Sequence, residues 1–136
     1  LNGTLKSGIE TVLDLLDFDR RLEGVDVVVT GEGATDWQSV FGKVMQGVGI
    51  HCKAHGIPAV AIVGSMGKGA EDIFEYGIES MITTINGVMT LPEALDHAEE
   101  LYLGAARRLF RMLRAGRKLS VAVNGVNSND SHKRAE

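Results

Sequence analysis

Cysteine is almost missing from this sequence: Cys52 stands alone, so neither an internal disulfide nor a paired-cysteine zinc motif can form. Because disulfides mark oxidising compartments, their absence favours a reducing one, and we expect the protein to be cytoplasmic. Cys52 follows Val48 at helical spacing, which predicts a small buried apolar residue and not a nucleophile.

Long apolar runs and an excess of positive charge are missing as well. No stretch approaches the roughly 20 apolar residues that cross a bilayer, and the N-terminus has no charged segment followed by an apolar one. A net charge of −4 provides no basic field for phosphodiesters. We therefore expect neither a membrane nor a nucleic acid as partner. Leu1, which is not an initiating methionine, predicts that the chain begins inside a longer reading frame or after processing.

Proline and aromatic residues are scarce, whereas glycine and aliphatic residues are abundant. Two prolines, 17 glycines and 44% hydrophobic residues in 136 positions indicate one core with many tight turns between regular elements. Apolar periodicity predicts helices over about 8–16, 44–55 and from 90 onward, a short helix over 70–76, and buried strands over 25–29, 59–63 and 81–85.

The order of these elements predicts the fold class. Short strands separated by helices pair in parallel through right-handed crossovers, because antiparallel hairpins would not need such long connections. We expect an α/β fold, a three-layer α/β sandwich with a mostly parallel sheet of the Rossmann or flavodoxin-like kind. The α/β domain should cover residues 1–118. Residues 119–136 read as a flexible tail, in which 121–123 could add an edge strand.

The most informative segment covers residues 30–39 and continues to Gly42 and Lys43 at the start of a helix. Its glycines let backbone amides approach an anion, and the helix N-terminus and Lys43 add positive potential. Glu32 and Asp36 could hold Mg²⁺ or orient an attacking hydroxyl. A glycine-rich turn is also what the fold requires without any ligand, so the residues alone leave both interpretations open.

Two familiar nucleotide motifs are absent from this segment. After Gly31 and Gly33, Asp36 stands where a dinucleotide fingerprint requires a third glycine. Gly42 and Lys43 lack the upstream glycine and the following Ser or Thr of a P-loop. A nicotinamide site and a Walker-type kinase are therefore disfavoured.

The segment, together with residues 7–14, 18–19 and 25–29, resembles the C-terminal region of type I glycerate kinases, and the resemblance extends over about residues 1–113. In that family the loop reads Thr-Gly-Glu-Gly-Arg-x-Asp-x-Gln-Thr-x-x-Gly-Lys-x-Pro-x-Gly. This chain keeps Thr30, Gly31, Glu32, Gly33, Asp36, Gln38, Gly42, Lys43 and Gly47. It has Ala34 where the family usually has arginine, Ser39 for threonine and Met45 for proline. If that arginine contacts a phosphate or carboxylate, its loss removes roughly 1.5–3 kcal/mol.

The resemblance implies a fragment of a two-domain kinase whose active site lies between the domains, so the missing domain is an expected partner. It implies ATP and Mg²⁺ as cofactors and D-glycerate as substrate, with 2-phosphoglycerate as product. Asp36 and Glu32 are then the catalytic carboxylates or Mg²⁺ ligands, and Lys43 is the catalytic cation. The other candidates for substrate or phosphate binding are Thr30, Gly31, Gly33, Gln38, Ser39 and Gly42, with Ser65 and Lys68 after the next strand.

A second hypothesis is a non-catalytic binding or oligomerisation module derived from such a kinase, which the loss of arginine at Ala34 favours. An exposed apolar patch and a homo-oligomer in solution would support it. His51 and His55 lie one helical turn apart, but the sequence offers no acidic partner beside them, so no metal is expected there.

Overall fold

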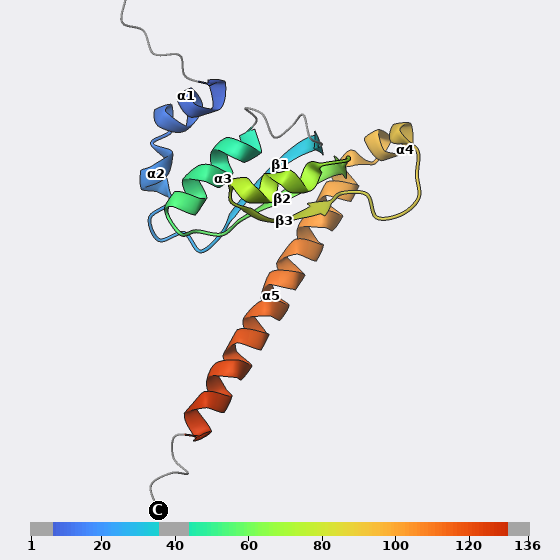
Figure 1. The fold of residues 1–136 in the computed structure, drawn as a ribbon. Coiled ribbons are helices and arrows are strands. Elements are labelled where there is room, and N and C mark those ends of the chain that lie inside the picture. The colour runs from blue at the N-terminus through green and yellow to red at the C-terminus, as the bar shows by residue number, and fades with distance from the viewer. Residues whose placement is uncertain (1–6, 36–43, 131–136) are drawn as a thin grey trace, which may run out of the picture.

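The computed structural model describes residues 7–35 and 44–130, in which three parallel strands carry helices on both faces (Figure 1). The elements are α1 (Gly8–Leu15), α2 (Phe18–Arg21), β1 (Val28–Thr35), α3 (Val44–Ala54), β2 (Ala59–Met66), η1 (Ala70–Tyr76, a 3₁₀ helix), β3 (Ile78–Thr83), α4 (Leu91–Asp96) and α5 (Ala98–Asp130). Within these described ranges, no helix is both long and apolar enough to span a bilayer.

The sheet has the order β1-β2-β3, and both pairings are parallel. The register of β1 and β2 runs from Val28 opposite Ala59 to Thr35 opposite Met66. Parallel neighbours need a crossover, which α3 provides between β1 and β2 and η1 provides between β2 and β3. The predicted α/β class with a mostly parallel sheet is confirmed.

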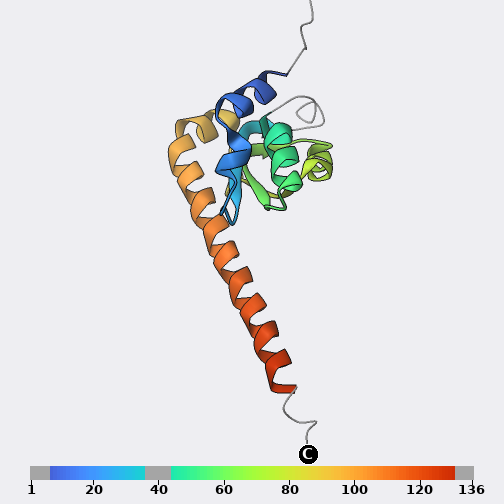
Figure 2. The same ribbon diagram turned by 90° about the vertical axis from the view of Figure 1, so that its left-hand side faces the viewer.

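The central strand β2 shows why there are three layers, because its side chains alternate between the two faces. Ala61 and Val63 pack in a cluster with side chains from α1, α3 and η1, whereas Val60 and Ile62 pack against Ala105 and Leu109 of α5. Figure 2 shows α5 crossing the opposite side of the sheet from α3 and continuing well past it.

The helix starts follow the predicted capping chemistry. Ser7 Oγ accepts a hydrogen bond from the Glu10 amide at 3.3 Å. At α4, Thr90 and Glu93 form a complete capping box, in which the Thr90 amide donates to Glu93 Oε2 at 2.7 Å. Gly56, predicted to follow the end of α3, has a left-handed backbone with φ 67°.

Strand boundaries differ from the prediction. β1 starts at Val28 and runs on to Thr35, and β2 runs on to Met66, so both include glycine-rich sequence that we expected to be loops. The glycines permit the strands to approach each other: a Cβ on Gly64 would lie 2.0 Å from Gly33 O, and one on Gly31 would lie 2.3 Å from Ile62 O. β3 lies earlier than predicted and ends at Thr83.

The predicted C-terminal helix is divided into two. At His97 the backbone leaves helical values, with φ −108° and ψ 19°, so that α4 closes over the strand ends while α5 packs on the sheet. The edge strand considered for residues 121–123 is wrong, because α5 continues through them without meeting a proline. That residues 119–136 move independently stays a prediction.

Candidate functional site

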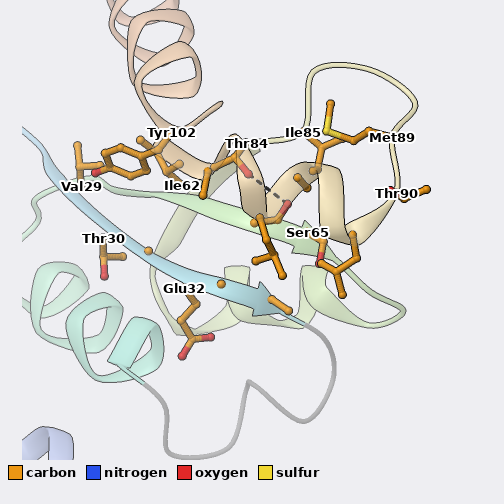
Figure 3. A pocket seen from close by; sticks show the side chains of 18 residues that line it. Val29, Thr30, Glu32, Ile62, Ser65, Thr84, Ile85, Met89, Thr90 and Tyr102 are labelled. Atoms are coloured by element: carbon orange, nitrogen blue, oxygen red, sulfur yellow. Dashed lines mark hydrogen bonds between the residues drawn. The ribbon is translucent and has the colours of Figure 1, made fainter. Parts of the chain in front are cut away.

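A cavity of about 1130 Å³ lies at the carboxyl ends of the strands, beneath α4 and the first turns of α5 (Figure 3). In open parallel sheets this edge is where ligands commonly bind. Its walls come from β1, β2, the segment after β3, α4 and α5. The lining residues are Val29, Thr30, Gly31, Glu32, Gly33, Ala34, Ile62, Gly64, Ser65, Thr84, Ile85, Met89, Thr90, Leu91, Ala94, Leu95, Ala98 and Tyr102.

The structure brings part of the predicted site together. Thr30, Gly31, Glu32, Gly33 and Ser65 all line this cavity, although they come from two strands and not from loops. Lys68 is exposed and is not among the lining residues. The remaining predicted residues lie outside the described part of the chain: Asp36, Gln38, Ser39, Gly42 and Lys43.

Strand β1 separates the cavity into two sides. Thr30 and Glu32 point toward α3, whereas Tyr102 and Ile62 lie on the α5 side (Figure 3). This follows from strand alternation, which sends successive side chains to opposite faces. The polar candidates therefore face one side of the strand ends, and the apolar wall faces the other.

Ala34, which replaces the family's arginine, is part of the lining and pairs with Ser65 across the sheet. Its backbone belongs to β1, so an arginine at this position would project from the strand end beside the cavity. If the family has arginine here, as the resemblance implies, this chain lacks a long cationic side chain at the rim of the cavity.

Sequence reasoning missed the wall contributed by α4 and α5. Leu91, Leu95, Ala98 and Tyr102 follow one another at three- to four-residue steps, which is the spacing of a helix face. That signal was present, but the stripe that packs α5 on the sheet passes through Leu101, Ala105 and Leu109 instead. The stripe from Leu91 to Tyr102 lines the cavity because the chain turns at His97.

Two hydroxyls of the cavity make hydrogen bonds within the protein. Thr84 Oγ1 donates to Gly64 O at 3.4 Å, and Thr90 Oγ1 donates to Glu93 Oε2 at 2.8 Å. Thr90 Oγ1 also accepts from the Glu93 amide at 3.5 Å, as part of the capping box of α4.

Glu32 is the one charged side chain among the described residues that line the cavity, and it is half-buried. No group of three or more His, Cys, Asp or Glu side chains within residues 7–35 and 44–130 could hold a metal ion. Mg²⁺ in phosphotransferases usually relies on one or two carboxylates together with substrate phosphates. The described donor set fits that kind of site and not an all-protein cage.

A second polar cluster joins α1, α2 and α3, and it corrects the expectation that His51 and His55 have no acidic partner. Asp19 Oδ1 lies 2.6 Å from His51 Nδ1 and 3.2 Å from His55 Nε2. Glu10 Oε2 lies 3.3 Å from His51 Nε2. The pairing was invisible in the sequence because 32 residues separate Asp19 from His51. Cys52 is fully buried, which confirms its predicted place in the core, and burial raises the pKa of its thiol.

This cluster predicts a pH-dependent stability. The hydrogen bond that His51 donates to Asp19 raises the pKa of His51 above its ordinary 6.5, against the opposing effect of burial, and the same bond lowers the pKa of Asp19 below its ordinary 3.8. The histidine contribution is therefore fully present below about pH 6.5 and is lost as the pH rises through the raised pKa. The aspartate contribution is present above about pH 3.8 and is lost as the pH falls through the lowered pKa.

We expect urea unfolding to show a greater free energy of unfolding at about pH 5.5 than at about pH 8.5. His51→Gln should remove most of that difference, whereas His97→Gln, at an exposed position, should keep it. An unchanged pH difference in His51→Gln would show that the cluster does not couple protonation to folding.

A parallel α/β domain with a glycine-lined cavity at the strand ends belongs to the class of small-ligand-binding α/β proteins. The model of the glycerate kinase family matches residues 1–114. The chain is 38% identical over 109 residues to a glycerate kinase of Halalkalibacterium halodurans, which covers 80% of this chain and 29% of that protein. It is 33% identical over 116 residues to a glycerate 2-kinase of Escherichia coli, covering 85% of this chain and 30% of that protein.

Among solved structures, that of a putative glycerate kinase 2 from Salmonella typhimurium LT2 matches with a TM-score of 0.63 and 34% identity, over 85% of this chain and 29% of that one. The chain belongs to the glycerate kinase family. It spans less than a third of the length of these relatives.

Proposed function

We propose that the protein formed with this chain is a glycerate kinase, which transfers the γ-phosphate of ATP to a hydroxyl of D-glycerate and yields 2-phosphoglycerate. The observation that carries the proposal is the convergence of Thr30, Gly31, Glu32, Gly33 and Ser65 on one cavity at the strand ends. Relatives named as glycerate kinases share 33–41% identity with the chain, which supports the same reaction. We place this reaction in the cytoplasm.

The residues of β1 would then act on the phosphates and on the attacking hydroxyl. In phosphoryl transfer the protein contributes mainly by positioning the reactants and stabilising charge, so fixed backbone amides and one well-placed carboxylate can contribute much. Glu32 would hold Mg²⁺ or orient the hydroxyl of glycerate, with Asp36 in the companion role. Mg²⁺, when bound, would neutralise phosphate charge. Lys43 would do the same, and Gln38, Ser39 and Gly42 would contribute further contacts to the substrate or its phosphates.

The rest of the site would come from polypeptide that this chain does not contain. Since the chain matches about 29% of its relatives' length, the proposed partner is the remaining part of such a kinase. We propose that this part closes the cavity and contributes to glycerate binding. Because Ala34 stands where the family usually has arginine, binding of phosphate or carboxylate at this rim would be weakened but not abolished.

The experiment joins the chain to such a partner. A chimera is made by replacing the matching segment of the Halalkalibacterium halodurans glycerate kinase with residues 1–114 of this chain. Phosphorus NMR with MgATP and D-glycerate then distinguishes 2-phosphoglycerate from 3-phosphoglycerate and from simple ATP hydrolysis. Formation of 2-phosphoglycerate is expected. A folded chimera without phosphoglycerate would contradict the proposal.

One observation favours a second candidate, the non-catalytic module that self-associates. Leu91 and Leu95 are 71% and 66% exposed, and Tyr102 is 53% exposed, so α4 and α5 present an apolar surface. Sedimentation of the isolated chain tests it: a concentration-dependent dimer with an inactive chimera would favour the module over the kinase.

A further inference from the structure

The cavity is chemically asymmetric in a way that distinguishes the two substrates of the proposed reaction. Its α4 and α5 side consists of Leu91, Leu95, Ala98 and Tyr102, with Ile62 below them. Among the described lining residues only Glu32 is charged, and it points to the other side of β1 (Figure 3). The apolar side therefore suits a ligand part with little charge.

Glycerate is a small hydroxy acid that is charged at neutral pH, so it gains nothing from an aliphatic wall and loses hydration there. The base of ATP has the opposite properties, because its ring has flat apolar faces and a polar edge. The Tyr102 ring is half-exposed and lies on this wall, where a purine could stack on it. A cavity of about 1130 Å³ has room for a nucleotide.

We propose that the side of the cavity formed by Leu91, Leu95, Ala98 and Tyr102 binds the adenine ring of ATP. The phosphates would then run over the carboxyl ends of β1 and β2 toward the side of Glu32, where glycerate is placed. This inference rests on the proposed kinase function, and it assigns the nucleotide to this chain and not to the missing part of the protein.

The test measures binding to the isolated chain, before any catalysis. Adenosine, ATP and inorganic triphosphate are titrated and followed by NMR chemical-shift changes. Tyr102→Ala should weaken the binding of adenosine and ATP about 10-fold or more, the usual loss when an aromatic platform for a base is removed, and should leave triphosphate unchanged. Leu103→Ala, an exposed neighbour outside the cavity, should bind all three like the unchanged chain.

Three outcomes would overturn the inference, and a fourth would contradict only the proposed function. Absence of adenosine binding at millimolar concentration, or equal ATP binding by Tyr102→Ala and the unchanged chain, would show that the base lies elsewhere. Loss of adenosine binding in the chimera would show that the missing polypeptide covers this wall. An inactive chimera that still binds adenosine through Tyr102 would defeat the proposed kinase function and leave the base site standing.

Discussion

Gly64→Ala should destabilise the chain by about 3 kcal/mol or more, the upper end of what forced overpacking costs. The added Cβ would lie 2.0 Å from Gly33 O and 3.0 Å from Gly33 C, which are backbone atoms of the neighbouring strand. A backbone in a paired strand cannot turn aside as a flexible side chain can. The ends of β1 and β2 would have to separate, and the cavity would lose its floor. Urea unfolding followed by circular dichroism measures the effect.

The matched control is Gly33→Ala, on the strand that Gly64 touches. A Cβ at Gly33 meets no atom within 4 Å, and the backbone there is not left-handed. Its free energy of unfolding should remain within about 1 kcal/mol of the unchanged chain, with a small gain because alanine lowers the entropy of the unfolded state. Equal stability of the two variants would show that the strands do not approach as closely as described.

The structure also bears on why this segment is rich in glycine. From the sequence alone, Gly31 and Gly33 could either let backbone amides approach an anion or simply form a turn, and both interpretations were open. The structure gives Gly31 and Gly64 a packing reason, since a side chain at either would strike the adjacent strand. A Cβ on Gly33 would meet none of the described atoms within 4 Å, so the service of Gly33 to an anion stays a prediction.

Local signals predicted most of the fold correctly. β-branched runs located the three strands, and the capping residues Ser7 and Thr90 located two helix starts, because these effects depend on neighbouring residues. The strand ends were wrong because ladder hydrogen bonds with a partner strand, which the sequence does not display, extend β1 and β2 through glycine. The turn at His97 was missed for a similar reason, since the helical pattern continues on both sides of it.

The residues that line the cavity were predicted in part for the same physical reasons. Thr30 and Glu32 were expected directly after the first strand and lie in its last residues, so the parallel fold was enough to place them at the carboxyl-end edge of the sheet. Ser65 was expected directly after the next strand and lies near the end of β2. The apolar wall with Tyr102 depends on how α4 and α5 fold back, and the contacts of Asp19 with His51 and His55 depend on how α2 packs on α3.

Glu32→Gln should lower kcat of the chimera at least about 100-fold, the usual loss when a carboxylate that acts in the transition state becomes neutral. Glu32 is the charged group that the described lining places at the strand ends. Glutamine keeps the size of the side chain, so the change isolates the charge. Phosphorus NMR or a coupled ADP assay measures kcat and the KM for each substrate. Glu79→Gln, at an exposed position on β3, is the matched control and should leave kcat unchanged.

The dependence on Mg²⁺ then separates the two roles open to Glu32. If the carboxylate binds the ion, Glu32→Gln should raise the Mg²⁺ concentration required for half-maximal rate, because one of the one or two protein ligands is lost. If it orients the attacking hydroxyl, that concentration should stay the same while kcat alone falls. Thermal unfolding must match the unchanged chimera in either case. A kcat within about threefold of the unchanged chimera would show that neither role belongs to Glu32, and that the carboxylate chemistry lies in residues 36–43 or in the rest of the kinase.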